Sequence, residues 1–124
     1  MWKEDLVEIS YKTKKVKRLC EDYSHAKRIL AQQEVNKLYK CIQFIAAASC
    51  LLDVKNHPPY SNLEKLKGDR ENTYSLAFNS KRSSYRLILI PLDERDNEMT
   101  DDNIHRLYKN TMKIKILEVS KHYE

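Results

Sequence analysis

The sequence predicts an α+β domain, residues 1–124, in which a mostly antiparallel sheet of about four strands carries an N-terminal helical hairpin on one face. Three observations predict this class. Two long segments near the N-terminus repeat apolar residues at helical spacing, without glycine or proline. Two later segments alternate apolar and polar residues, as strands do. A short alternating segment precedes the helices, so the order is strand, two helices, then strands.

The first half of the chain holds the first strand and both helices of the hairpin. Residues 6–11 alternate as a strand, and Thr13 is placed to cap a helix that runs to residue 30. A second helix is expected over residues 33–53. Because the connection between the two helices is short, they should pack as an antiparallel pair.

The second half of the chain is predicted to complete the sheet. Pro58 and Pro59 stop the helical pattern, and Gly68, the only glycine, marks a turn with positive φ. Strands are expected over residues 74–79 and 85–90, with Pro91 closing the second of them. A short helix near residues 102–109 and a last strand over residues 113–120 follow, ahead of a four-residue tail.

The composition predicts a globular protein outside the membrane. Hydrophobic residues make up 41% of the chain and charged residues 33%, a balance typical of soluble domains. No stretch reaches the roughly 18 apolar residues of a membrane span, and the N-terminus shows no signal region. Cys20, Cys41 and Cys50 lie on predicted helices, outside any zinc-binding spacing. We therefore expect a cytoplasmic protein with buried thiols and no metal or other cofactor.

The charge distribution indicates a basic working surface. The formal net charge is +5 and the pI is near 9.0, and a small basic domain often binds nucleic acid through its phosphates. Residues 91–104 nevertheless carry six acids against one arginine. This split predicts a basic face for function and an acidic loop that faces elsewhere.

Several short runs, in a fixed order around Gly68, resemble one family. These runs are residues 63–70 (LEKLKGDR), 74–76 (YSL), 85–88 (YRLI), 116–123 (ILEVSKHY) and the early segment 17–22 (KRLCED). Together they resemble the HigB-like killer toxins of the RelE/ParE toxin superfamily. The resemblance implies a single RelE-like toxin domain that acts as a ribosome-dependent mRNA endonuclease. It also implies a tightly bound HigA-like antitoxin with a helix-turn-helix domain.

Metal-independent RNA cleavage requires a base for the 2′-OH, an acid for the leaving 5′-oxygen and a cation for the phosphate. The resemblance implies that Arg86 contacts the scissile phosphate, with His122, Tyr123 and Lys121 beside it. Relatives often end in Asp-Tyr-His where this chain has Lys121-His122-Tyr123, and some carry a histidine at the position of Glu64. Which group moves each proton therefore stays open.

Five basic residues in two loops are candidates for binding the RNA backbone. They are Lys65, Lys67, Arg70, Lys81 and Arg82.

Each of these residues also has an ordinary structural interpretation. Arg86 can pair with Glu118 or another acid across the sheet, and the tail and loop residues can simply be solvated. Two other functions remain open as well: a non-catalytic ParE-like toxin that inhibits DNA gyrase by protein contact, and a nucleic-acid binding module without activity. No recognised RNA-binding motif supports the binding module.

Overall fold

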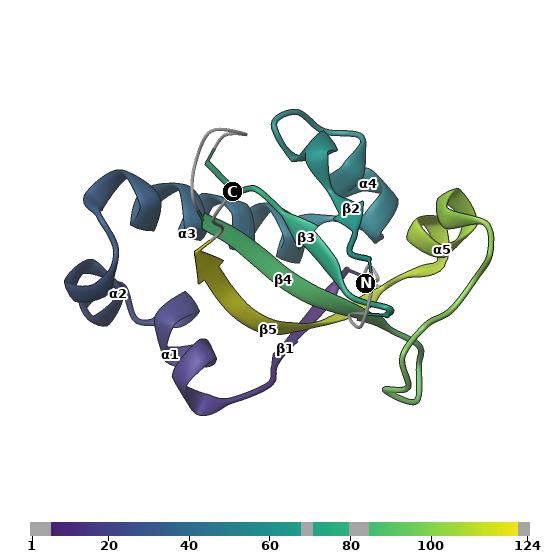
Figure 1. The fold of residues 1–124 in the computed structure, drawn as a ribbon, viewed down its shortest axis with the longest axis horizontal. Coiled ribbons are helices and arrows are strands. Elements are labelled where there is room, and N and C mark those ends of the chain that lie inside the picture. The colour runs from purple at the N-terminus through teal and green to yellow at the C-terminus, as the bar shows by residue number, and fades with distance from the viewer. Residues whose placement is uncertain (1–5, 68–70, 80–84, 122–124) are drawn as a thin grey trace, which may run out of the picture.

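The computed structural model describes residues 6–67, 71–79 and 85–121, which form one five-stranded sheet covered by helices (Figure 1). The spatial order of the strands is β1-β5-β4-β3-β2, with β1 parallel to β5 and the other pairs antiparallel. The strands are β1 (Glu8–Tyr11), β2 (Glu64–Lys65), β3 (Tyr74–Leu76), β4 (Tyr85–Leu92) and β5 (Lys113–Lys121). The predicted α+β class is confirmed, and the two-residue β2 adds a strand to the expected sheet.

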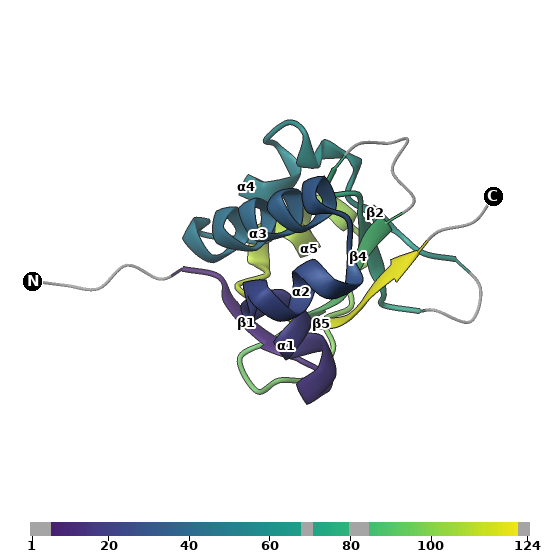
Figure 2. The ribbon, with the colours of Figure 1, turned by 90° about the vertical axis from the view of Figure 1, so that its left-hand side faces the viewer.

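Helices α1 to α3 lie together on one side of the sheet, as Figures 1 and 2 show from two directions. The helices are α1 (Lys14–Glu21), α2 (Tyr23–Ile29), α3 (Gln32–Ala47), α4 (Leu51–Lys55) and α5 (Ile104–Asn110), with a short 3-10 helix η1 (Tyr60–Asn62). None of the helices in the described part of the chain has the length and apolar character needed to cross a membrane.

The prediction of two continuous helices is wrong, because the structure breaks each of them. Asp22 has an extended backbone, and its carboxylate accepts a hydrogen bond from the His25 N–H at 3.1 Å, which caps α2. The second break lies at Ala48, whose carbonyl accepts a hydrogen bond from the Val7 N–H at 2.8 Å. Local capping therefore divides the first helix, and contact with the chain entering β1 divides the second.

The two faces of the sheet differ in character because side chains alternate along each strand. Leu87, Leu89 and Ile116 are fully buried in one core with Leu38 and Ile45 of α3. We call this side the helix face. The opposite side, which we call the outer face, carries Arg86, Ile88, Glu118 and Ser120 according to the strand register.

Pro91 was expected to end its strand, but β4 continues past it. The reason is that the position of Pro91 in the sheet needs no N–H donor. The Pro91 carbonyl accepts a hydrogen bond from the Met99 N–H at 2.9 Å, so its backbone groups point away from β5. Pairing between β3 and β4 has ended by this point, after Leu89. The segment at Met99 bonds to this edge in place of β3 and needs no N–H from residue 91. Proline is tolerated at such an edge position, and β4 continues to Leu92. Gly68, the predicted turn residue, lies outside the described residues.

Candidate functional site

Arg86 lies near the start of β4 on the outer face of the sheet. It pairs directly with Ser120 of β5, while Glu118 is its diagonal neighbour on the same face. The Arg86 side chain is half-buried, and its Nη1 donates a hydrogen bond to the Tyr85 carbonyl at 3.0 Å. The guanidinium is thus held at the end of the sheet where β4 begins and β5 ends.

A pocket of about 440 Å³ opens beside Arg86, between the outer face and the segment that follows α4. Its lining comes from Lys55, Ser61, Asn62, Leu63, Glu64, Ser75, Ala77 and Arg86. The lining contains two cations, one carboxylate and several polar groups. A volume of this size falls within the range of small-ligand sites, and an arginine fork matches the oxygens of a phosphate group.

The wall of the pocket opposite Arg86 is fixed by hydrogen bonds of two side chains. The Asn62 amide accepts from the Ala77 N–H at 2.7 Å and donates to the Ala77 carbonyl at 3.1 Å and the Pro59 carbonyl at 2.8 Å. The Lys55 ammonium donates to the carbonyls of Ser61 and Leu63, the latter at 3.0 Å. These bonds hold the 3-10 helix against the end of β3.

The floor of the pocket is made of small side chains. Ser75 and Ala77 are 6% and 3% exposed, and neither carries a bulky group that would fill the space beside Arg86. Glu64 pairs with Ser75 across β2 and β3, so its carboxylate shares the outer face with the arginine. The pocket therefore places an arginine, whose fork matches phosphate oxygens in shape, beside a carboxylate, a group that can accept a proton.

The structure separates three of the predicted site residues from Arg86. Lys65 pairs with Tyr74, whose side chain belongs to the core, so it lies on the helix face. Lys121 pairs with Tyr85, which also packs against the core, and so points away from the outer face. Lys67 is exposed after β2 and is not among the residues that line the pocket.

Five predicted site residues lie outside the described residues. They are Arg70, Lys81, Arg82, His122 and Tyr123.

Sequence reasoning missed the other side of the pocket, formed by Lys55, Asn62 and Ser75. Lys55 ends a five-residue helix, and Asn62 belongs to a three-residue 3-10 helix. Neither segment is long enough to produce a readable periodicity. The one available signal was Ser75, which falls in the YSL run and on the face opposite Tyr74 and Leu76.

The described histidines lie apart from the pocket. None of His25, His57 and His105 lines the pocket beside Arg86. His57 instead stacks on Phe44, with ring centroids 4.4 Å apart and an interplanar angle of 23°. Residues 6–67, 71–79 and 85–121 also contain no group of three His, Cys, Asp or Glu side chains arranged to hold a metal ion.

Two of the three cysteines are buried, as predicted. Cys20 and Cys41 lie in the core, while Cys50 is half-buried. Burial raises the pKa of Cys20 to about 12, with the nearby Glu21 charge adding to the shift. Burial also raises the pKa of Cys41. Neither core cysteine is a reactive thiolate at neutral pH.

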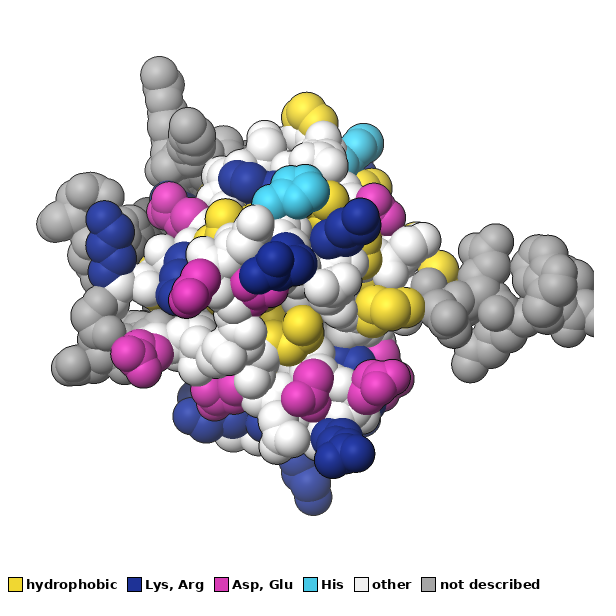
Figure 3. Space-filling view, turned by 90° about the vertical axis from the view of Figure 1, so that its right-hand side faces the viewer, with side chains coloured by type: hydrophobic (Ala, Val, Ile, Leu, Met, Phe, Trp, Pro, Cys, Tyr) yellow, Lys and Arg dark blue, Asp and Glu magenta, His cyan; other side chains and the backbone are white. Residues whose placement is uncertain are grey.

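Two acids of the acidic segment, Asp96 and Asp101, pair with nearby cations. Asp101 accepts two hydrogen bonds from the Arg106 guanidinium, at 2.7 and 2.8 Å. Asp96 pairs with the Lys113 ammonium at 3.2 Å. On the face of the molecule that holds α5, basic and acidic side chains are interspersed, with hydrophobic ones between them (Figure 3). This face therefore offers no surface of a single charge sign.

Comparisons with known proteins find structural likeness at low sequence identity. No protein-family model matches the sequence, and the comparison with curated proteins finds no match. Among solved structures, the chain is similar to a YoeB/ParE toxin from Agrobacterium tumefaciens, with a TM-score of 0.48 and 16% sequence identity. The alignment covers 94% of this chain and all of the other. This degree of similarity does not assign the chain to a family.

Proposed function

We propose that this protein is a HigB-like toxin of the RelE/ParE kind, which stops translation by cutting mRNA on the ribosome. The observation that carries the proposal is the position of Arg86, which lines a polar pocket on the outer face, beside the end of β5. The order of the sequence runs around residues 63–90 and 116–123 supports the same function.

In the proposed reaction the ribose 2′-OH attacks the adjacent phosphorus. The P–O bond to the 5′-oxygen breaks, leaving a 2′,3′-cyclic phosphate and a free 5′-OH. Arg86 stabilises the extra negative charge on the phosphate through paired N–H donors. One group removes the 2′-OH proton and another protonates the departing 5′-oxygen.

Two sets of residues are candidates for the proton transfers. His122 and Tyr123 follow Lys121 directly in the sequence, and Lys121 pairs with the neighbour of Arg86 in β4. Histidine suits this role because its unperturbed pKa is close to neutral pH. Glu64 is the second candidate for the base, since it lines the same pocket as Arg86. We assign no proton transfer to Lys121, because its strand partner Tyr85 faces the core.

The partners of this toxin would be the ribosome, its mRNA, and a HigA-like antitoxin with a helix-turn-helix domain. The direct test adds the purified chain to a translation extract that contains an end-labelled mRNA. We expect cleavage only while ribosomes translate the message, with cyclic phosphate ends on the upstream fragments. Intact mRNA, together with loss of supercoiling by purified DNA gyrase, would instead establish the ParE-like function. Intact mRNA with salt-sensitive RNA binding would establish a binding module.

Substitutions in the tail and at Glu64 identify the proton-transfer groups. We expect His122→Gln and Tyr123→Phe each to slow cleavage by roughly 10²-fold, the size of a typical general acid or base contribution. Glu64→Gln keeps the shape of the side chain and removes only its charge. One result would assign the base to Glu64: Glu64→Gln slows cleavage by roughly 10²-fold, and a chain lacking residues 121–124 keeps full activity. The tail would then have no part in the chemistry.

A further inference from the structure

The outer edge of β1 lies at the opposite end of the sheet from the Arg86 pocket. The strand order β1-β5-β4-β3-β2 leaves β1 paired on one side only. Along this pair the N–H groups of Glu8 and Lys12 donate to Met112 and Ile116, both at 2.9 Å. Because alternate residues of a parallel strand bond to the same neighbour, the backbone groups of Ile9 and Tyr11 point away from β5.

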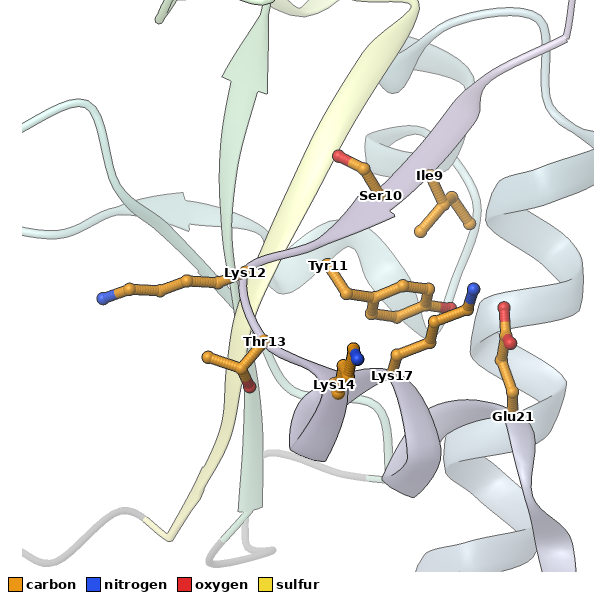
Figure 4. Close-up of a pocket in the computed structure, with 8 residues that line it drawn as sticks. All are labelled: Ile9, Ser10, Tyr11, Lys12, Thr13, Lys14, Lys17 and Glu21. Atoms are coloured by element: carbon orange, nitrogen blue, oxygen red, sulfur yellow. The ribbon is translucent and has the colours of Figure 1, made fainter.

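These outward backbone groups border an open hollow of about 420 Å³ (Figure 4). Its lining comes from five consecutive residues, Ile9, Ser10, Tyr11, Lys12 and Thr13, and from Lys14, Lys17 and Glu21 of α1. In Figure 4 the Tyr11 ring lies between β1 and α1, with Lys17 and Glu21 at its hydroxyl end. Within the described residues, no backbone hydrogen bond outside the sheet ladder reaches Ile9 or Tyr11.

The surface beside this edge is strongly basic. Residues 12–18 (KTKKVKR) contain five cations and no acid, and all five cations are exposed. The acids that face them are Glu21, which lines the hollow, and Asp22, which pairs with Arg18 at 3.7 Å. The excess of positive charge therefore lies directly beside an unpaired strand edge.

We propose that the outer edge of β1 binds an extended, acidic segment of a partner protein, which adds to the sheet as a further strand. The outward N–H and C=O groups of Ile9 and Tyr11 alternate, as they would opposite another peptide backbone. Phosphate groups only accept hydrogen bonds, and the donors of RNA, its ribose 2′-OH and base N–H groups, do not alternate with acceptors at the spacing of a peptide backbone. The edge thus favours a peptide over RNA, and the lysines favour acidic side chains on that peptide.

This inference goes beyond RNA cleavage and does not depend on it. If the toxin proposal is correct, the partner is the antitoxin, but the edge and its charge are properties of the fold alone. Because the Arg86 pocket lies toward β2, Arg86→Ala should leave peptide binding unchanged. The two proposals can therefore fail separately.

The test uses a fluorescent eight-residue peptide of alternating glutamate and valine, titrated into the full chain. A control peptide has the same sequence with every backbone nitrogen methylated, which keeps its charge and removes its N–H donors. An eight-nucleotide polyuridylate provides a second anionic probe. Amide hydrogen exchange is followed at Ile9 and Tyr11, with Ser10 as the internal reference because its backbone faces β5.

We expect the unmethylated peptide alone to bind and to slow exchange at Ile9 and Tyr11. Reversing three lining charges, in Lys12→Glu, Lys14→Glu and Lys17→Glu combined, should weaken binding about tenfold. The matched control reverses Lys37, Lys40 and Lys109, which are also exposed but lie on α3 and α5, and should change binding little. Absence of binding by the unmethylated peptide would overturn the inference. It would also be overturned if the methylated peptide or polyuridylate bound as tightly as the unmethylated peptide and none of the probes slowed exchange at Ile9 and Tyr11.

Discussion

At the scale of single residues, the Asn62 side chain makes the backbone hydrogen bonds that a neighbouring strand would otherwise make. Its amide bonds to both the N–H and the carbonyl of Ala77, just beyond the end of β3. Because Ala77 is 3% exposed, water cannot readily replace these bonds. The same side chain anchors the Pro59 carbonyl and so joins the 3-10 helix to the floor of the Arg86 pocket.

We therefore predict that Asn62→Ala lowers the free energy of unfolding by about 2 kcal/mol, because it leaves buried backbone groups of Ala77 without partners. Urea denaturation followed by circular dichroism measures the change. Asn110→Ala serves as the control, since Asn110 is exposed at the end of α5 and its substitution should change stability by about 0.5 kcal/mol or less. Equal effects of the two substitutions would show that the Asn62 bonds do not support the pocket.

The candidate site was partly predictable at this scale. Arg86 was identified because the YRLI run sets it on the face opposite Tyr85 and Leu87. Lys65 is expected in a loop but lies in β2, because a two-residue strand is too short to show an alternation. Asn62 and Lys55 could not be predicted as pocket residues. Their hydrogen bonds to the backbone of Ala77 and Leu63 follow no periodic pattern in the sequence.

At the scale of secondary structure, α5 is held by a carboxylate just before its start. Asp101 accepts two hydrogen bonds from Arg106 and one from the Asn103 N–H at 2.9 Å. The Arg106 hydrogen bonds, followed by that of Asn103, hold the pKa of Asp101 below its usual value of 3.8. A carboxyl group with a lowered pKa in the folded state stabilises the protein above its unfolded pKa, and this stabilisation is lost as the pH falls through the folded pKa.

We predict that Asp101→Asn reduces stability at neutral pH and that its difference from the wild type disappears in acid. The difference in urea midpoint should stay constant from about pH 7 to pH 5 and shrink below about pH 4, where the wild-type carboxylate takes up its proton. Asp102→Asn, at an exposed position next to it, should change the urea midpoint at neutral pH by less. A difference for Asp101→Asn that persists unchanged to pH 2 would contradict an ionic role for Asp101.

The helices also show what a sequence pattern leaves out. Helical spacing correctly predicted the apolar side of α3, where Leu38 and Ile45 are buried. It did not predict the breaks at Asp22 and Ala48, because helical spacing of apolar residues continues across both. A capping carboxylate makes one break, and a hydrogen bond to the chain entering β1, far away in sequence, accompanies the other.

At the scale of the whole molecule, the sheet presents two different surfaces at its two edges. The pocket of Arg86 lies toward β2, and the basic hollow lies along β1. The α+β class and the order along the chain of every strand except β2 were predictable from alternation, whereas the parallel pairing of β1 with β5 was not. That pairing joins the two ends of the chain in sequence, and no local pattern specifies such a contact.

The central claim is that the Arg86 guanidinium stabilises the phosphate during RNA cleavage, and the most direct measurement is the cleavage rate of the Arg86→Ala protein. With ribosomes translating a labelled mRNA, we expect Arg86→Ala to cut at least roughly 10²-fold more slowly than the wild type. Arg86→Lys should recover only part of the rate, because lysine lacks the paired donors of arginine. Arg28→Ala, which removes an exposed arginine of α2, should cut at the wild-type rate. A folded Arg86→Ala protein that cuts the mRNA as fast as the wild type would contradict the claim.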